Sequence, residues 1–347
     1  MHQGIFIVVV YVLMALLCLL FVIILCYILY KNKIAASKSE WQQHVQAIIN
    51  NALFSPEPGE AARSAAPLGL LKNMRFRNYL IEEIVQIKKN LAGDAGLALC
   101  ELYETLELDK NSFTKLQSLR WHIKAKGIQE LSIMEQRKYV KTIFRLTNNK
   151  NQLIRNEAQC ALVNFYGFPG LRFLNVMTHS ISQWQQIHLL DKMNGQIPED
   201  MSVIKNWLRS PNESLVIFSL KLATHYNCFE LQADVMQCVN MSYEVRNYVM
   251  EYMKKMPTAH AGDFLLSDYD NQDKDCKLLT LQTLKEVGNE THILRLINFL
   301  DGAEDEVVSQ ILETLLVLNP LGAFQSSIFS HNNQAATVVK LSNEHAA

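Results

Sequence analysis

The sequence predicts an all-α protein in which a single N-terminal transmembrane helix precedes a superhelix of stacked helix pairs. Three observations lead to this prediction. The chain begins with an unbroken apolar run, later segments repeat apolar side chains at helical spacing, and a helix-start pattern recurs about every 30 residues. Alternating polar and apolar runs, which would predict strands, do not stand out anywhere in the sequence.

The apolar run predicts a membrane anchor over residues 1–38. Ile5 to Tyr30 contains no charged side chain, and about 20 apolar residues suffice for a helix to cross the hydrocarbon core. A cleaved signal peptide is the main alternative, but its apolar core has only about 7–15 residues and follows a basic start. Here Met1 to Gly4 contains no lysine or arginine, so the anchor is the better interpretation.

Basic residues on one side of the run predict the topology. Lysines follow the run directly and none precedes it, so the positive-inside rule places the C-terminal body in the cytoplasm, at an inner or plasma membrane. Five of the seven cysteines lie scattered in the body, an odd number that suits reduced thiols. Glycosylation triplets at Asn212, Asn240 and Asn289 leave an exported body as an open alternative.

The near-neutral net charge conceals two opposed halves. Residues 31–150 hold 19 Lys+Arg against 12 Asp+Glu, a net of +7, and residues 151–347 hold 14 against 22, a net of −8, which sum to −1. Anionic lipids attract basic residues near the headgroups by about 1 kcal/mol each. We therefore expect the tethered half to face the membrane, with these candidate lipid-facing residues: Lys31, Lys33, Lys38, Lys72, Arg75 and Arg77.

The rest of the chain divides by composition. Residues 39–67 are predicted to be a juxtamembrane helix, which either continues the membrane helix or lies along the membrane surface, followed by a proline- and alanine-rich linker. Residues 68–140 predict a helical capping region or diverged repeats, and residues 141–320 predict the repeats proper. Residues 321–347 predict a tail with little packed structure.

An internal repeat is the second strong signal. Each copy opens with Ser, Asn or Asp, the side chains that accept hydrogen bonds from unpaired amides of a first helical turn. A second apolar segment lies between successive copies, so each unit reads as a pair of helices that must stack on neighbours to bury its apolar face. The copies begin at Asn151, Ser182, Asn212, Ser242, Asp275 and Asp305, with spacings of 31, 30, 30, 33 and 30 residues.

The first helix of these units resembles HEAT repeats, especially the short kind called PBS-lyase-like. Their usual pattern is Asp-x-x-Val-Arg followed by small and apolar positions. Ile154-Arg155 and Val245-Arg246 match it best, whereas Val308-Ser309 lacks the arginine. The resemblance covers roughly residues 140–318 and implies an α-solenoid. It implies little about function, because HEAT repeats serve many roles.

The sequence contains no recognisable catalytic, metal or cofactor motif, so we expect a non-enzyme that needs no cofactor or metal. Nucleic acid is not an expected partner, because the repeat half is acidic and the chain has a membrane segment. The acidic stretch Ser267–Asp275 invites a calcium interpretation, but Asp273 and Leu279 stand where an EF-hand needs Gly and Glu. We expect a turn between helices with N-capping carboxylates there.

The function we expect is that of a membrane-anchored scaffold or adaptor that binds a membrane-associated protein through the concave face lined by the second helices. Two alternatives stay open: an enzyme with a site in the solenoid groove, and a lipid- or envelope-associated structural factor that uses the basic half. Aromatic side chains and arginines concentrate binding energy at interfaces. Tyr243 and Arg246, near a helix start, are expected to be partly exposed, and the candidate partner-binding residues are Arg155, Trp184, Trp207, Tyr243 and Arg246.

Overall fold

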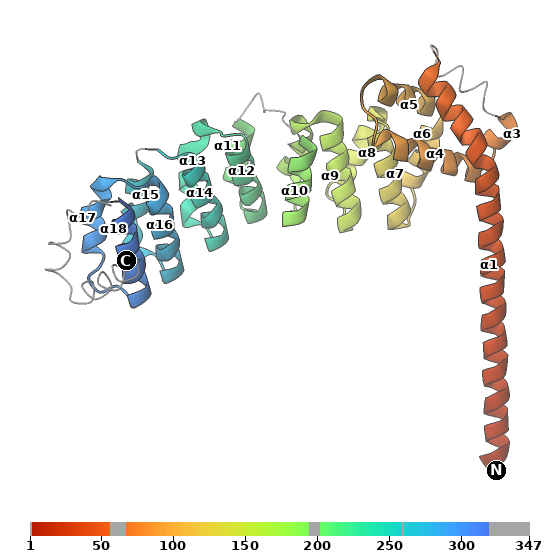
Figure 1. Cartoon of the computed structure of the whole chain (residues 1–347), viewed down its shortest axis with the longest axis horizontal. Coiled ribbons are helices and arrows are strands. Elements are labelled where there is room, and N and C mark those ends of the chain that lie inside the picture. The colour runs from red at the N-terminus through yellow and green to blue at the C-terminus, as the bar shows by residue number, and fades with distance from the viewer. Residues whose placement is uncertain (1, 56–66, 194–201, 259, 319–347) are drawn as a thin grey trace, which may run out of the picture. The chain divides into compact units, whose positions relative to one another are not determined.

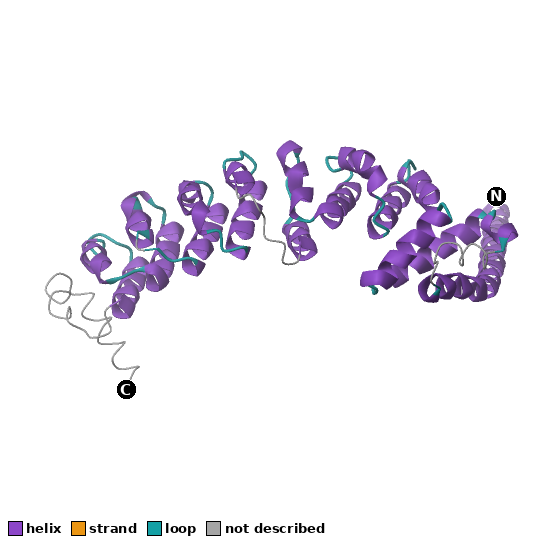
Figure 2. Cartoon of the chain, turned by 90° about the horizontal axis from the view of Figure 1, so that it is seen from above, coloured by secondary structure: helices purple, strands orange, loops and turns teal. Residues whose placement is uncertain are grey.

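The computed structural model describes the chain except for residues 1, 56–66, 194–201, 259 and 319–347 (Figure 1). The described residues form helices joined by turns and contain no strand, which confirms the all-α prediction (Figure 2). The chain divides into two compact units, Met1–Leu171 and Arg172–Ala347. Nearly all of the predicted linker and the whole predicted tail lie outside the described residues.

One continuous helix, α1 (His2–Phe54), contains the apolar run. Its segment Tyr11–Asn32 has a mean hydropathy of 3.3 and no buried residue, and it is long and apolar enough to cross a membrane. The predicted juxtamembrane helix is the continuation of α1, so the first of the two alternatives for that segment is the one observed.

The C-terminal part of α1 belongs to the core of unit 1. It packs against α4 (Met74–Lys88) and α5 (Gly93–Thr105), with the four-residue helix α3 (Leu68–Leu71) alongside α4. Trp41 meets Phe76 edge-on, with ring centroids 5.8 Å apart. The buried residues contributed by α1 are Val45, Ile48, Ile49 and Ala52. The helix that contains the apolar segment is thus also a structural part of the folded domain.

The rest of unit 1 comprises α6 (Leu108–Leu116), α7 (Trp121–Ile133), η1 (Arg137–Tyr139), α8 (Val140–Leu146) and α9 (Gln152–Tyr166). The 3-10 segment η2 (Phe168–Val176) crosses the boundary between the units. Helices α6 and α7 approach so closely that a Cβ at Gly127 would lie 2.5 Å from the Leu116 backbone nitrogen. Glycine at this position therefore permits the contact between the two helices.

Buried polar groups join α6 to α7. Glu130 is buried and accepts hydrogen bonds from Lys115 Nζ, at 2.7 Å, and from Ser112 Oγ, at 2.5 Å. The Tyr103 hydroxyl of α5 donates to Ser112 Oγ at 2.7 Å. Because each of these hydrogen-bonding side chains has a partner, the buried charge of Glu130 is compensated.

Unit 2 is a succession of helix pairs. The first helices are α10 (Gln183–Met193), α12 (Glu213–His225), α14 (Tyr243–Lys255), α16 (Lys274–Val287) and α18 (Asp305–Leu318), and from α12 onward each packs on the next. The second helices are α11 (Ser202–Leu208), α13 (Gln232–Gln237), α15 (Ala261–Ser267) and α17 (Ile293–Asn298). Short 3-10 turns complete the pairs: η3 (Phe229–Leu231), η4 (Cys238–Asn240), η5 (Tyr269–Asn271) and η6 (Glu290–His292).

The structure corrects the register of the repeat. The α16 cap is Asp273, whose carboxylate accepts from the Cys276 amide at 2.8 Å, rather than Asp275. The last helix begins at Asp305, so the preceding residue is Glu304. With these two positions the spacings become 31, 30, 30, 31 and 31 residues. The side chain seven residues after each of these positions is fully buried: Ala158, Leu189, Ser219, Val249, Thr280 and Ile311.

Candidate functional site

The two motif arginines are buried and make hydrogen bonds to the chain just before their own helices. Arg155 Nη1 donates to the Asn149 carbonyl at 2.7 Å, and Arg246 Nε donates to the Val239 carbonyl at 2.9 Å. Their exposed fractions are 9% and 8%, so the expectation that Arg246 is partly exposed is wrong. Burial lowers the pKa of the Arg155 guanidinium. Both side chains fix a turn, which leaves little of either for a partner to contact.

Trp207 is also a core residue. It lies on the second helix α11, is 3% exposed, and donates from Nε1 to Asn175 Oδ1 at 2.7 Å. Buried tryptophans usually find such an acceptor. Trp207 therefore stabilises the packing of α11 in unit 2 and does not offer its ring to a partner.

Trp184 and Tyr243, by contrast, are exposed aromatic residues at helix starts. Trp184 of α10 is 66% exposed, and the centroid of its ring lies 5.0 Å from that of the His188 ring. Tyr243, the first residue of α14, is 49% exposed. Ile187, one helical turn beyond Trp184, is 62% exposed, and sequence reasoning missed it because an isoleucine at this spacing normally indicates core.

Hydrogen bonds join these helix starts into one surface, which we call the acidic edge. Gln183 Nε2 donates to Glu244 Oε1 at 3.3 Å, and Ser242 Oγ donates to Glu213 Oε2 at 3.1 Å. Further along, Lys274 pairs with Glu306 at 2.7 Å. Carboxylates dominate the exposed side chains at the starts of α12 to α18: Glu213, Glu244, Asp273, Asp275, Glu304, Asp305 and Glu306.

Helix electrostatics account for part of this charge. Acidic side chains near a helix start interact favourably with the macrodipole, by about 0.3–1 kcal/mol each, and Asp273 is a cap. The same argument gives no reason for large apolar side chains to be exposed at these starts. Trp184, Ile187 and Tyr243 are therefore the part of the acidic edge that folding alone does not explain.

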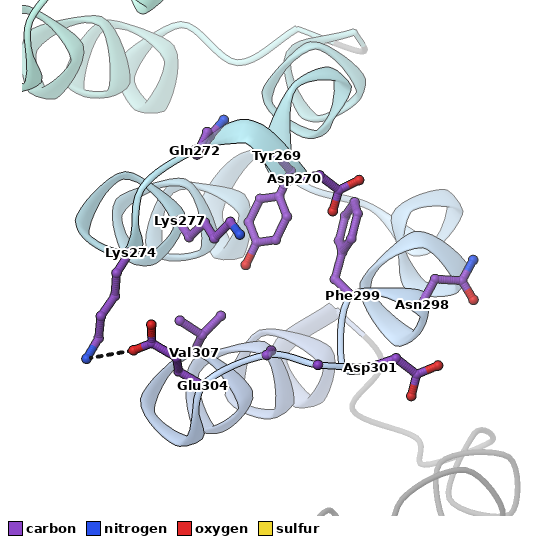
Figure 3. A pocket seen from close by; sticks show the side chains of 12 residues that line it. Tyr269, Asp270, Gln272, Lys274, Lys277, Asn298, Phe299, Asp301, Glu304 and Val307 are labelled. Atoms are coloured by element: carbon purple, nitrogen blue, oxygen red, sulfur yellow. Dashed lines mark ion pairs between the residues drawn. The ribbon is translucent and has the colours of Figure 1, made fainter.

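The acidic edge is hollowed near the starts of α16 and α18 by a cavity of about 270 Å³. Figure 3 shows the side chains that line it. The Tyr269 hydroxyl is buried there with no hydrogen-bond partner among the described residues, and burial raises the pKa of this phenol. The centroid of its ring lies 4.4 Å from that of the Phe299 ring. Lys277, at the position of the motif arginine, places its Nζ 5.6 Å from the centre of the Tyr269 ring.

The acidic side chains around this cavity do not converge on one point. Asp301 points away from the cavity, and Glu304 pairs with Lys274 at its rim (Figure 3). Among the residues that the structure describes, no group of three or more His, Cys, Asp or Glu side chains is arranged to hold a metal ion. The cavity thus presents a phenol and an ammonium group rather than a cluster of carboxylates typical of acid–base catalysis.

The candidate lipid-facing residues differ in how firmly they are held. Arg77 is half-buried, and it donates to Asn111 Oδ1 and to the Glu107 carbonyl, each at 2.8 Å; burial lowers its pKa. Lys38 Nζ lies 5.2 Å from the centre of the Tyr79 ring. Four of the candidates have exposed side chains: Lys31, Lys38, Lys72 and Arg75. The side chain of Lys33 lies outside the described residues.

Comparison with known proteins assigns no family: no family model matches the chain, and no curated protein matches it.

Proposed function

We propose that this protein is a membrane-anchored scaffold built of HEAT-like repeats, and that its acidic edge binds a basic, membrane-associated protein partner. The observation that carries the proposal is the exposure of Trp184, Ile187 and Tyr243 beside a row of carboxylates. Large exposed apolar side chains with a polar rim are typical of protein-binding surfaces. The surface proposed here is formed by the starts of the first helices, not by the face of the second helices expected from sequence.

The corrected register supports the HEAT-like assignment. The third position after each cap is buried in every copy, and in two copies the fourth is an arginine bonded to the turn before its helix. A third copy places Lys277 at the same position. The pattern Asp-x-x-Val-Arg therefore has a physical role here: the cap and the arginine together fix the entry of the chain into each first helix.

The anchor is supported by the continuity of α1. A cleaved leader would be removed at a site after its apolar core, but here the same helix runs on from Tyr11–Asn32 to the core residues Val45 to Ala52. A helix that spans the bilayer and then enters the domain core would hold the repeats at the membrane. A tether of this kind raises the effective concentration of partners in the same membrane. The lysines after the apolar segment favour a cytoplasmic body.

Charge and aromatic residues would play different parts in binding. Carboxylates along the edge would steer a basic partner and increase its association rate, an effect that salt screens. Trp184, Ile187 and Tyr243 would supply most of the binding energy, because aromatic residues dominate the few positions where truncation is costly. The partner we expect therefore has a basic surface with an apolar centre.

The test is affinity purification of the full chain from gently solubilised membranes, with crosslinking and mass spectrometry. We expect a near-stoichiometric membrane protein crosslinked close to residues 182–187 and 242–244, and a loss of about tenfold or more in capture for Trp184→Ser combined with Tyr243→Ser. Phe229→Ser is the matched control, because Phe229 of η3 is 60% exposed in the same unit but follows the end of α12 rather than the start of a first helix.

Equal capture by the double variant and the control would contradict a role for the acidic edge. Recovery of the chain with lipid alone would contradict the scaffold function itself. Extraction of the wild-type chain by alkaline carbonate would show that α1 is not a membrane anchor.

A further inference from the structure

A second set of helix starts, in unit 1, also exposes large apolar side chains. Leu119, in the turn before α7, is 100% exposed. Trp121, the first residue of α7, is 48% exposed, and Leu153 near the start of α9 is 50% exposed. Exposed apolar side chains that gather on one surface with polar residues around them are typical of protein- or membrane-binding sites.

The starts of α7 and α9 lie side by side. The two helices pack on each other, and Asn164 Nδ2 near the end of α9 donates to Ser132 Oγ near the end of α7 at 3.0 Å. Because the two helices pack on each other and their C-terminal ends are in contact, they run in the same direction. The offset of 32 residues between Ser132 and Asn164 also separates Trp121 from Leu153, so these two side chains belong to one surface.

The charged side chains at these two starts all carry the same sign. The segments 117–129 and 146–156 contain no Asp or Glu. Lys126 is paired with Glu82, but Arg120, Lys124 and Lys150 form no ion pair with any described residue. We call the surface formed by Leu119, Arg120, Trp121, Lys124, Lys150 and Leu153 the basic edge.

Unit 1 lies close to the bilayer if α1 spans the membrane. About 13 residues of helix separate Asn32, at the end of the apolar segment, from Val45 in the core of unit 1, which at 1.5 Å per residue is roughly 20 Å. A domain of about 130 residues has a radius of gyration of about 14 Å. The surface of unit 1 therefore extends to within a few ångströms of the lipid headgroups.

We propose that the basic edge is a second membrane contact: Trp121 and Leu119 enter the interfacial region of an anionic bilayer while Arg120, Lys124 and Lys150 contact lipid phosphates. Tryptophan concentrates at the membrane–water interface, and basic residues gain from the negative surface potential of the cytoplasmic leaflet. This inference rests on the proposed anchor. It adds a separate property, because unit 1 would be held against the membrane instead of turning freely on α1.

The test uses the full chain in nanodiscs whose lipids carry bromine on the acyl chains, since bromine quenches the fluorescence of tryptophans that it approaches. The signal of Trp121 is the difference between the wild type and Trp121→Phe, a conservative change at a half-exposed site. We expect quenching of this signal in nanodiscs containing phosphatidylserine, and several-fold less in phosphatidylcholine alone. Reversal of Arg120, Lys124 and Lys150 to Glu should lower the equilibrium constant of the contact by about fivefold per residue.

Trp184→Phe is the matched control, because Trp184 is an exposed tryptophan of unit 2, and this variant should keep the quenching of Trp121. As a second readout, amide hydrogen exchange across residues 117–124 should slow in phosphatidylserine nanodiscs, and Leu119→Ser should reduce that protection. An unquenched Trp121 in both lipids overturns the proposal, and so does equal quenching in both.

Two further outcomes separate this proposal from its premise. Failure of the chain to insert into nanodiscs at all contradicts the anchor and, with it, this contact. Insertion without quenching of Trp121 contradicts the contact alone. A photo-crosslinking amino acid at position 119 that captures a protein rather than lipid in native membranes also overturns it.

Discussion

The basic edge of unit 1 and the acidic edge of unit 2 are both formed by helix starts with exposed apolar side chains, but their charges are opposite. In unit 2 the exposed residues Trp184 and Tyr243 stand among carboxylates, whereas in unit 1 the exposed residues Trp121 and Leu153 stand among unpaired cations. The helix macrodipole favours carboxylates at every start. Unit 1 nevertheless has no acidic residue in the first turns of α4, α7, α8 and α9. The acidic edge follows from helix physics in part, but the basic edge opposes it.

One ion pair from each unit shows how burial changes what such a pair contributes. The pair between Lys115 and Glu130 of unit 1 is buried, with side-chain exposures of 13% and 3%, while that between Lys285 and Glu313 of unit 2 is partly exposed, with 21% and 63%. A buried pair contributes to stability only while both members are present, whereas exposed pairs contribute little. Removing one partner should therefore have very different costs for these two pairs.

The largest expected effect comes from breaking the buried pair. Glu130→Ala leaves Lys115 without its partner in a poorly hydrated site, and we expect a loss of about 3–5 kcal/mol in the stability of unit 1. Amide hydrogen exchange of α6 and α7 in the full chain measures this loss locally. Glu313→Ala is the control in unit 2 and should cost less than about 1 kcal/mol. Similar losses of stability for Glu130→Ala and Glu313→Ala would contradict the expected difference between a buried and an exposed ion pair.

A smaller effect tests the cavity in the acidic edge. Tyr269→Phe removes a buried hydroxyl that has no partner among the described residues, so the free energy of unfolding should rise by about 1 kcal/mol. Tyr252→Phe is the matched control, because the Tyr252 hydroxyl donates to the Cys228 carbonyl at 2.6 Å, and its loss should cost about 1 kcal/mol. Thermal unfolding of unit 2 in the full chain gives both values. A destabilising Tyr269→Phe would indicate that something in the cavity binds this hydroxyl.

The smallest effect separates folding from function at the helix starts. Arg120→Glu places a carboxylate at the start of α7, so helix stability should rise by about 0.3–1 kcal/mol while the quenching of Trp121 by brominated lipid falls. Glu213→Lys makes the opposite change at α12 and should lower helix stability by a similar amount. Hydrogen exchange of the first-turn amides measures both. A loss of stability in Arg120→Glu would mean that this arginine serves the fold.

Local sequence patterns were sufficient to predict the elements. The apolar run of α1, the absence of strands among the described residues and the caps Asn151, Asn212 and Ser242 all follow from interactions within a few residues of chain. Helical spacing reports which side chains share a face. Capping depends on one side chain and the amides two or three residues later. Both features depend only on residues close together in the chain, so they can be predicted from the sequence.

The register of the fifth repeat shows where local patterns fail. Asp273 and Asp275 are both acceptable caps by residue type, so residue type does not select between them, and the structure shows Asp273 as the cap of α16. Burial of Thr280, seven residues later, depends on that choice. A two-residue shift turns a helix by about 200°, so neighbouring repeats decide what a single repeat leaves open.

The sequence by itself determined the fold class, the apolar helix and the opposed charges of the two halves, because composition and periodicity are properties of the chain alone. Only the tertiary structure decided which predicted binding residues are available. Arg155, Trp207 and Arg246 are buried by contacts with segments that precede their own helices, whereas Trp184 and Tyr243 are left exposed. Exposure depends on what packs against a side chain, and for Trp207 one such neighbour is Asn175, 32 residues away in sequence.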